Sequence, residues 1–221
     1  MYNSSFQSAE SGKDLKIILV GNVSTGKTSI IERYIHNKFQ QKIKATLSPN
    51  FSYKLINKNN VNYRLQFWDI PGQDRSPSLT SVFCRDAHGF VFCCDTLVKK
   101  TRNDILIWKN NLENFMDISN IPTIIMENKC DLLGDESMYE NDIDELNNFT
   151  KENNFTGAFR TSALNGYNID KAMDFLIEAI IKKMKEDNKN NINKNNNNIK
   201  LQQVKKIKLN KDVRDKDKKC C

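Results

Sequence analysis

Short apolar runs alternate along the chain with segments in which apolar residues recur every three or four positions. Continuous apolar runs bounded by polar residues indicate buried strands, and the wider spacing indicates helices that bury one face. We therefore expect strands at residues 15–20, 51–58, 61–70, 89–96, 121–129 and 158–162. We expect helices at residues 26–39, 104–116, 139–154 and 168–184.

Two of these helices have apolar positions that predict a buried face. In the first helix these positions are Ile30, Ile31, Tyr34 and Ile35. In the second helix they are Ile105, Trp108, Leu112 and Phe115. Strands that alternate with such helices favour an α/β fold with a mostly parallel sheet. The polar turn at residues 57–60 joins two strands directly, so we expect this pair to be antiparallel, at one edge of the sheet.

The basic character of the chain is concentrated near its end. The 221 residues carry a net charge of +7 at pH 7. Residues 182–221 contain 14 Lys or Arg and 5 Asp or Glu, so they carry +9 and residues 1–181 carry −2. Residues 188–198 contain eight Asn in eleven positions, which cannot bury apolar surface. The predicted organisation is a disordered polar arm, one folded domain and a disordered Asn- and Lys-rich tail, at residues 1–13, 14–185 and 186–221.

The cysteines and histidines do not indicate disulfide bonds or a metal site. Cys93 and Cys94 lie inside an apolar run, where thiols behave as small hydrophobes. His36 and His88 are far apart, and no spacing typical of metal ligands is present. The sequence shows neither a signal-peptide pattern at its start nor a run of 18 apolar residues. We therefore expect a reducing, cytosolic environment.

One loop has the spacing of a phosphate-binding site. Gly21 and Gly26 enclose four residues, Lys27 and Thr28 follow, and the loop joins a predicted strand to a predicted helix. Glycines allow backbone N–H groups to turn toward phosphate oxygens, and the helix N-terminus adds partial positive charge. In such loops the Lys reaches the β- and γ-phosphates and the hydroxyl ligates Mg²⁺. The alternative is a glycine-containing helix start with no ligand, which the strand, loop and helix together disfavour.

The sequence NKCD, at residues 128–131, predicts which base the nucleotide carries. The Asp131 carboxylate can accept hydrogen bonds from the N1–H and the amino group of guanine, and Lys129 can lay its stem along the ring. Adenine lacks that pair of donors and would leave the carboxylate unsatisfied. Guanine is therefore the expected base.

A third motif, WDIPGQD at residues 68–74, predicts the catalytic part of the site. Asp69 ends a predicted strand, where it can hold Mg²⁺ through water. Gly72 allows a backbone N–H to approach the γ-phosphate, and Gln73 is placed to orient an attacking water.

With these motifs in this order, the chain resembles a Ras-type small GTPase and, more narrowly, a Rab. The segments RLQFWDI, WKNNLENF and FTGAFRTSALNGYNIDKAMDFL resemble most the Rab subgroup linked to lysosome-related organelles. The resemblance implies a P-loop NTPase three-layer fold, with a mostly parallel six-stranded sheet, one antiparallel edge strand and helices on both faces. It also implies a monomer that binds GTP, GDP and Mg²⁺, hydrolyses GTP to GDP, and regulates vesicle trafficking by recruiting effectors in its GTP form.

The resemblance further implies the roles of individual residues. Switch segments at residues 37–53 and 71–85 order around the γ-phosphate and loosen after hydrolysis. Phe39 stacks on the guanine. The implied catalytic residues are Gln73 and Lys27, and the implied Mg²⁺ ligands are Thr28, Thr46 and Asp69. The implied nucleotide-binding residues are Gly21, Asn22, Val23, Ser24, Thr25, Gly26, Lys27, Thr28, Ser29, Phe39, Thr46, Asp69, Gly72, Asn128, Lys129, Asp131, Thr161, Ser162, Ala163 and Leu164.

The chain departs from the Rab pattern at several of these positions. Two residues after the switch I threonine, Thr46, Ser48 stands where the family usually has a glycine. Pro49 fixes a backbone angle at the next position. Pro71 replaces the alanine before the switch II glycine, and Leu164 replaces a lysine beside the base. Val23 and Pro71 both narrow the space around the catalytic glutamine, so one hypothesis is slow intrinsic hydrolysis. The alternative is that the site has adjusted and hydrolysis is ordinary for a Rab.

The end of the chain resembles the double geranylgeranylation signal of Rabs, with Cys220 and Cys221 as the lipidated residues. Stable anchoring takes two such signals, and a basic tail adds attraction to an anionic membrane. The resemblance implies a prenylation escort protein, a GDP-dissociation inhibitor, an exchange factor, an activating protein and effectors as partners. It places the protein on the cytosolic face of an intracellular membrane, with a cytosolic pool. Nucleic-acid binding by the tail is disfavoured because the tail has no aromatic residue to stack on bases.

The sequence is compatible with two other functions. The altered residues Val23 and Pro71 favour a GTP-bound membrane scaffold with little turnover, whereas intact Thr28, Thr46 and Gln73 favour a hydrolysing switch. An ATP-using kinase or ATPase could share the phosphate loop, but the NKCD motif argues against it.

Overall fold

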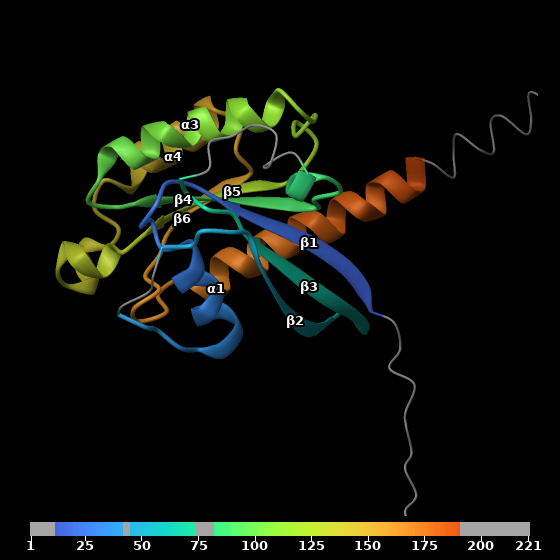
Figure 1. Ribbon diagram of the computed structural model, residues 1–221, viewed down its shortest axis with the longest axis horizontal. Helices are drawn as coiled ribbons and strands as arrows, with labels where there is room; N and C mark the ends of the chain where they lie inside the picture. Colours follow the sequence, from blue (N-terminus) through green and yellow to red (C-terminus); the bar gives the residue numbers. More distant parts are fainter. Residues whose placement is uncertain (1–11, 42–44, 74–81, 191–221) are drawn as a thin grey trace, which may run out of the picture. The chain divides into compact units, whose positions relative to one another are not determined.

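The computed structural model of the chain describes residues 12–41, 45–73 and 82–190 (Figure 1). Contacts divide the chain into two units, residues 1–180 and residues 181–221. The first unit contains the sheet and the predicted site. In the second unit the described residues, 181–190, are helical. Among the described residues no helix is both long and apolar enough to cross a membrane.

Six strands of the first unit form one sheet. Their order across the sheet is β2-β3-β1-β4-β5-β6, and β2 runs antiparallel to β3 while the other neighbours are parallel. This confirms the predicted α/β fold with its antiparallel edge strand. The strands are β1 Lys13–Val20, β2 Asn50–Lys58, β3 Val61–Asp69, β4 Gly89–Asp95, β5 Thr123–Asn128 and β6 Gly157–Arg160.

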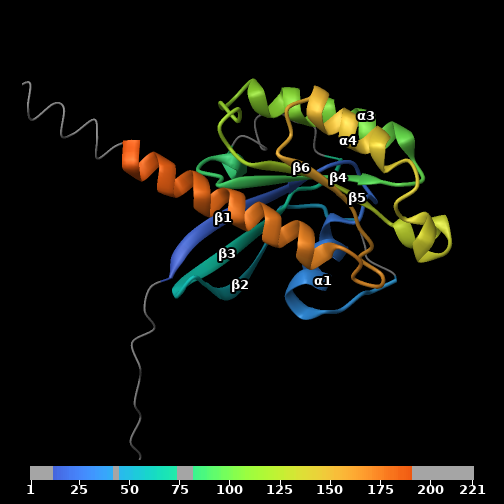
Figure 2. The same ribbon diagram turned by 180° about the vertical axis from the view of Figure 1, so that it is seen from behind.

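Helices cover both faces of the sheet. The helices α3 and α4 lie over one face, and α1 and the start of the C-terminal helix lie over the other (Figures 1 and 2). Leu176 and Ile180 of the C-terminal helix reach the sheet beside Gly89. The bounds are α1 Lys27–His36, α3 Lys99–Glu113, α4 Ile143–Glu152, short 3₁₀ turns at Cys130–Leu133 and Glu136–Met138, and a helix that begins at Ile169.

The core lies on both sides of the sheet, which explains the continuous apolar runs. Ile18 and Val20 of β1 pack into the cluster under α3 and α4. Because side chains of a strand alternate between faces, Ile17 and Leu19 point to the α1 side. All four are fully buried. A strand buried on both faces has no polar positions to alternate.

Two helix boundaries differ from the prediction for identifiable reasons. The helix expected at residues 104–116 begins at Lys99, after a turn in which the Leu97 N–H donates to the Asp95 carboxylate at 3.0 Å. It ends at Glu113, so Phe115 lies beyond it and is 43% exposed. The helix expected at residues 139–154 begins only at Ile143. In the segment before this helix, the carbonyl oxygens of Tyr139 and Asn141 accept hydrogen bonds from the Arg160 guanidinium. These hydrogen bonds keep that segment out of the helix.

The predicted domain limits also differ from the observed elements. β1 begins at Lys13, which pairs with Tyr63, although residue 13 was predicted to end the arm. Residues 186–190 were predicted to be tail but are helical, and a Lys183–Asp187 ion pair of 3.3 Å spans one helical turn there. The rest of the predicted arm and tail, residues 1–11 and 191–221, lies outside the described residues.

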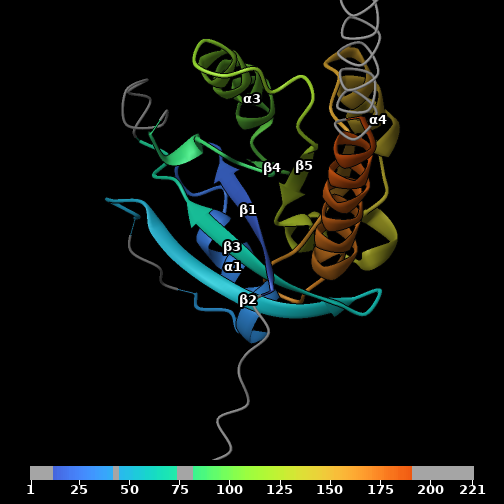
Figure 3. The same cartoon turned by 90° about the vertical axis from the view of Figure 1, so that its right-hand side faces the viewer.

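The parallel strands bring their C-terminal ends to one edge of the sheet. Leu19 of β1 lies beside Asp69 of β3, and Asp95 of β4 lies beside Asn128 of β5. In Figure 3 the arrowheads of β1 and β3 point the same way. The order of strands reverses around β1, and ligands of open α/β sheets bind outside the carboxyl ends at such a point. The sheet therefore carries the predicted motifs to one place.

Candidate nucleotide-binding site

The loop between β1 and α1 has a backbone that only glycine allows at two positions. Gly21 and Gly26 have φ of 141° and 94°. A Cβ on Gly21 would lie 2.2 Å from the carbonyl oxygen of Cys93, and one on Gly26 would lie 2.2 Å from Nδ2 of Asn128. The glycine spacing therefore reflects both a left-handed turn and close contact with β4 and β5.

Lys27 at the start of α1 is buried and faces back into this loop. Its Nζ donates hydrogen bonds to the carbonyl oxygens of Gly21, at 2.8 Å, and Asn22, at 3.0 Å. Burial lowers the pKa of Lys27. In the described part of the chain its hydrogen-bond acceptors are neutral, so its charge is available to an anion.

The three predicted Mg²⁺ ligands meet at one point. The Thr28 hydroxyl donates to Oδ2 of Asp69 and lies 3.1 Å from the Thr46 hydroxyl. The Thr46 hydroxyl lies 3.4 Å from the same Oδ2. The other carboxylate oxygen, Asp69 Oδ1, is buried and has no hydrogen-bond partner among the described residues, and burial raises the pKa of Asp69.

This set of donors fits Mg²⁺. Hydroxyl and carboxylate oxygens are hard ligands, and Mg²⁺ is usually held by one or two protein oxygens together with phosphate and water. Within the described ranges there is no cluster of three or more His, Cys, Asp or Glu that could hold a metal ion. The unsatisfied Asp69 oxygen is therefore the observation that favours a cation here.

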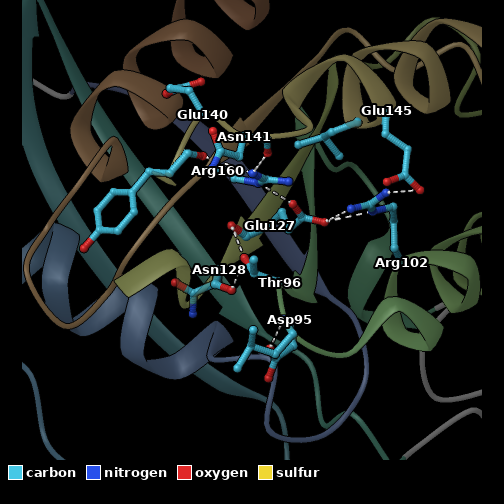
Figure 4. Close-up of polar contacts among 12 residues, drawn as sticks. Asp95, Thr96, Arg102, Glu127, Asn128, Glu140, Asn141, Glu145 and Arg160 are labelled. Carbon is cyan, nitrogen blue, oxygen red and sulfur yellow. Dashed lines mark hydrogen bonds and ion pairs between the residues drawn. The ribbon is translucent and has the colours of Figure 1, made fainter. Parts of the chain in front are cut away.

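Asn128, at the end of β5, joins two segments of the site. Its Nδ2 donates to the carbonyl oxygen of Thr25 at 3.0 Å, and its Oδ1 accepts from the backbone N–H of Ala163 at 3.1 Å. Figure 4 shows Asn128 beside Glu127, next to Asp95 and Thr96. The phosphate loop and the segment after β6 are thus connected through one side-chain amide.

The polar groups expected to contact the base are held in place by their neighbours. The Lys129 ammonium group forms an ion pair of 2.6 Å with Asp95. Asp131 accepts a hydrogen bond from the Ser162 hydroxyl. Lys129 has φ of 68°, so the chain turns sharply between the strand and Asp131.

The residues after β3 pack against the phosphate loop. Pro71 is buried, and Gly72 lies so close that a Cβ on it would be 2.3 Å from the backbone N of Val23. Gln73 is exposed. Val23 is itself 37% exposed, so the contact between the two segments is made by backbone rather than by the valine side chain.

A cavity of about 420 Å³ collects most of the predicted residues. We name two parts of this cavity after the ligand that the sequence predicts. The phosphate half is formed by Val23, Ser24, residues 26–29, Thr46 and Gly72, and the base half is formed by Phe39, Asn128, Lys129, Asp131, Leu132, Ala163 and Leu164. The lining residues are Val23, Ser24, Gly26, Lys27, Thr28, Ser29, Phe39, Gln40, Gln41, Ala45, Thr46, Gly72, Asn128, Lys129, Asp131, Leu132, Ala163 and Leu164.

Some predicted residues lie outside the lining. Five are buried in the walls: Gly21, Thr25, Asp69, Thr161 and Ser162. Gln73 is exposed and does not line the cavity. Parts of both predicted switches, residues 42–44 and 74–81, and the predicted lipidation sites Cys220 and Cys221 lie outside the described residues.

Asn22 was predicted to bind the nucleotide, and its side chain contacts α3, so its backbone is the part that can take this role. Its Nδ2 donates to Oδ2 of Asp104 at 2.6 Å, and its Oδ1 accepts from the indole N–H of Trp108 at 3.0 Å. Only its backbone carbonyl faces Lys27. The side chain of Asn22 therefore fastens the phosphate loop to the helix beneath it.

Several residues of the site were not predicted from the sequence. Gln40, Gln41 and Leu132 line the cavity, and their position next to Phe39 and Asp131 was a signal that could have identified them. Arg33 donates to the carbonyl oxygens of Ala163, at 2.9 Å, and Leu164, at 2.5 Å. No local pattern marks Arg33, because its partners lie 130 and 131 residues away.

Known proteins that resemble this chain belong to a family of nucleotide-binding proteins named in the Ras and Rab groups. The family model described as "Ras family" matches residues 16–182. Mouse "Ras-related protein Rab-32" is 38% identical over 170 residues, which are 75% of this chain and 75% of the relative. "Ras-related protein Rab-32C" of Dictyostelium discoideum is 38% identical over 167 residues, 76% of this chain and 73% of the relative.

A second group of relatives is named differently. Human "Ras-related protein Rab-7L1" is 35% identical over 176 residues, 78% of this chain and 85% of the relative. The residues matched by the family model, 16–182, include all the lining residues of the cavity and the sheet from Lys16 onward. The resemblance to Rab proteins stated from the motifs is confirmed by these relatives.

Proposed function

Because the chain belongs to the Ras family, whose members are GTPases, we propose that it is a Rab-type switch of the subgroup linked to lysosome-related organelles. In this proposal it binds GTP and GDP with Mg²⁺ and hydrolyses GTP. Its GTP form recruits effectors to a membrane, and its GDP form releases them. The observation that carries the proposal is that the phosphate loop and the NKCD segment line the same cavity.

In the phosphate half, backbone N–H groups of residues 22–27 and the Lys27 ammonium group bind the phosphates. Thr28, Thr46 and Asp69 hold Mg²⁺, which neutralises phosphate charge when bound. The buried charge of Lys27 and the unsatisfied Asp69 oxygen support these roles. Gln73 orients the water that attacks the γ-phosphate, which requires it to turn from its exposed position toward the cavity.

In the base half, Asp131 accepts hydrogen bonds from the guanine N1–H and amino group. The Lys129 stem and Phe39 cover the ring, and the Ala163 backbone contacts the guanine oxygen. Leu164 packs at the edge of the base without adding charge. The ion pair of Lys129 with Asp95 and the hydrogen bond from Ser162 to Asp131 support these roles because they fix both side chains.

Replacing Asp131 tests the nucleotide assignment. The wild type is expected to purify with guanine nucleotide and to prefer GDP to ADP and xanthosine diphosphate. Asp131→Asn should weaken GDP binding by about a hundredfold and shift preference toward xanthosine diphosphate, because the amide donates where the carboxylate accepted. Asp135→Asn, an exposed acid nearby, is the control. Wild-type protein without guanine nucleotide preference would overturn the proposal.

We place the protein on the cytosolic face of an intracellular membrane. Geranylgeranyl groups on Cys220 and Cys221, with the basic residues before them, would anchor it. A prenylation escort protein, a GDP-dissociation inhibitor, an exchange factor and an activating protein would be its regulators, and the protein would act as a monomer. Comparing the cellular location of the tagged full chain with that of a Cys220→Ser, Cys221→Ser variant tests the anchor.

A second candidate is a GTP-bound scaffold with slow turnover. It is favoured by the buried Pro71, the backbone contact of Gly72 with Val23 and the exposed Gln73. If crowding slows the reaction, Val23→Gly or Pro71→Ala should raise the single-turnover rate of GTP hydrolysis by about tenfold. Unchanged rates in both variants would contradict the crowding and leave the ordinary switch.

A further inference from the structure

A buried carboxylate lies directly beneath the base half. Glu127 of β5 is fully buried, and its side chain accepts from two arginines (Figure 4). Arg102 of α3 reaches Oε1 at 2.8 and 2.6 Å, and Arg160 of β6 reaches Oε2 at 2.8 Å. The side chains of the arginines are only 7% and 5% exposed. Burying such ions costs free energy unless they are paired, as these three are.

Glu127 and Arg160 each stand directly before a segment that leads to the base half. Glu127 is followed by Asn128, and Arg160 by Thr161. The Thr161 N–H donates to the Glu127 carbonyl oxygen at 2.9 Å, and the Cys130 N–H donates to the Thr161 carbonyl oxygen at 3.1 Å. The Glu127–Arg160 ion pair therefore joins the two strands at the point where they leave the sheet for the site.

Each arginine also has a partner farther out. Arg102 pairs with Glu145 of α4 at 3.0 Å. Arg160 donates to the carbonyl oxygens of Tyr139, at 3.1 Å, and Asn141. The charges alternate as Glu145, Arg102, Glu127 and Arg160, and Glu145 also lies 3.6 Å from Lys99 at the outer end.

Arg102 is influenced by burial and by its acidic partners in opposite directions. Burial lowers the pKa of Arg102, but Glu127 and Glu145 together raise it, so the pKa of Arg102 is raised. Neutralising Glu127 would leave two guanidinium groups facing each other in the interior. They would separate, and the segments attached to β5 and β6 would move with them.

We propose that Glu127 is a positioning residue for guanine: its ion pair with Arg160 fixes Asp131 relative to residues 161–163 and so sets how long the nucleotide stays bound and how strictly its amino group is read. This inference rests on the proposed function. A network that served only stability would change the melting temperature without changing the selection of the base.

The test compares nucleotide release from full-length variants loaded with a fluorescent GDP analogue, well below their melting temperatures. Glu127→Gln keeps the size of the side chain and removes its charge. It is expected to release GDP at least about tenfold faster than wild type. Glu145→Gln breaks the outer pair, whose acid is 52% exposed, and should change release by less than about twofold.

A second measurement separates positioning from stability. Inosine diphosphate lacks the amino group that donates a hydrogen bond to Asp131 in the proposed complex. The ratio of the affinity for GDP to the affinity for inosine diphosphate therefore reports the placement of Asp131. The ratio should fall several-fold in Glu127→Gln and stay unchanged in Glu145→Gln. If Glu127→Gln does not fold, Glu127→Asp, which keeps the charge on a shorter arm, should show the same two changes.

The outcomes are distinct. A folded Glu127 variant that melts lower but keeps the wild-type release rate and the wild-type ratio would overturn the positioning role. Wild-type protein that shows no preference for GDP would instead overturn the proposed function. Faster release of GDP together with a lower ratio supports both.

Discussion

The base half of the cavity is held together by contacts within the protein, whereas the phosphate half keeps polar groups that no described residue satisfies. Asn128, Arg33 and the Glu127–Arg160 pair connect the segments of the base half to one another. Around the phosphate half, and within the part of the chain that the structure describes, Lys27 donates to carbonyl oxygens and Asp69 Oδ1 has no hydrogen-bond partner. Among the described residues, the segments of the base half hold one another, although the buried Thr161 hydroxyl has no partner, whereas the polar groups of the phosphate half leave room for an anion and a cation.

This difference explains how a site of this kind can keep a nucleotide bound and still change its contacts when the phosphates of that nucleotide change. A preorganised base half loses little conformational freedom when the base enters. A phosphate half that relies on ligand charges changes its contacts when a phosphate or a metal ion leaves. Variants in the phosphate half should therefore have large effects on binding, and single contacts in the base half should have smaller ones.

The largest effect is expected for Lys27→Ala. The variant removes the buried positive charge of the phosphate half, so GTP affinity should fall by about a thousandfold. The melting temperature of the nucleotide-free protein should hardly change, because the hydrogen-bond partners of Lys27 are carbonyl oxygens. Titration with a fluorescent GTP analogue measures the affinity. Lys38→Ala, an exposed lysine near the same helix, is the control, and an equal loss in both would break the comparison.

Removal of Mg²⁺ comes next. Chelation should accelerate GDP release by about tenfold or more, because the phosphate charge is then opposed only by Lys27 and backbone N–H groups. Thr28→Ala should release GDP quickly without chelation and respond little to it. Stopped-flow release with excess unlabelled GDP measures both rates, and adding Mg²⁺ back should restore the wild-type rate. A Thr28→Ala protein as sensitive to chelation as wild type would show that Thr28 is not a ligand.

The smallest effect is expected for Arg33→Gln. The arginine donates to two carbonyl oxygens of the base half, but other contacts hold the same segment. GDP release should become faster by about two- to threefold, as for the loss of one partly exposed polar contact. Arg64→Gln removes an exposed pair with Asp14 at the opposite end of β1 and should leave release unchanged. A tenfold effect of Arg33→Gln would mean that the base half is less redundant than its contacts indicate.

The sequence was informative wherever chemistry depends on neighbours along the chain. The glycine spacing of the phosphate loop, Thr28, and residues 128–131 are local patterns, and each follows a strand whose apolar run is easily identified. The antiparallel edge pair followed from the short connection at residues 57–60. Parallel order then brought the separate motifs to the same edge of the sheet.

Contacts between distant residues could not be predicted in this way. Glu127 pairs with residues 25 and 33 positions away, and a buried glutamate in an apolar run gives no indication of its partners. Asn22 was assigned to the nucleotide because of its place in the motif, whereas Trp108 and Asp104 of α3 decide the direction of its side chain. Such assignments need the packing of helices on the sheet, which sequence periodicity does not supply.

One side chain, Asn128, belongs to both halves at once: its amide nitrogen holds the carbonyl of Thr25 while its oxygen holds the backbone of Ala163. The same nitrogen occupies the space that any side chain on Gly26 would need. A substitution of Asn128 is therefore expected to change both the selectivity for the purine and the affinity for the phosphates. Free guanosine and inorganic phosphate would each contact only one half of this shared structure. Each would therefore bind more weakly than its part of the binding free energy of the whole nucleotide would suggest.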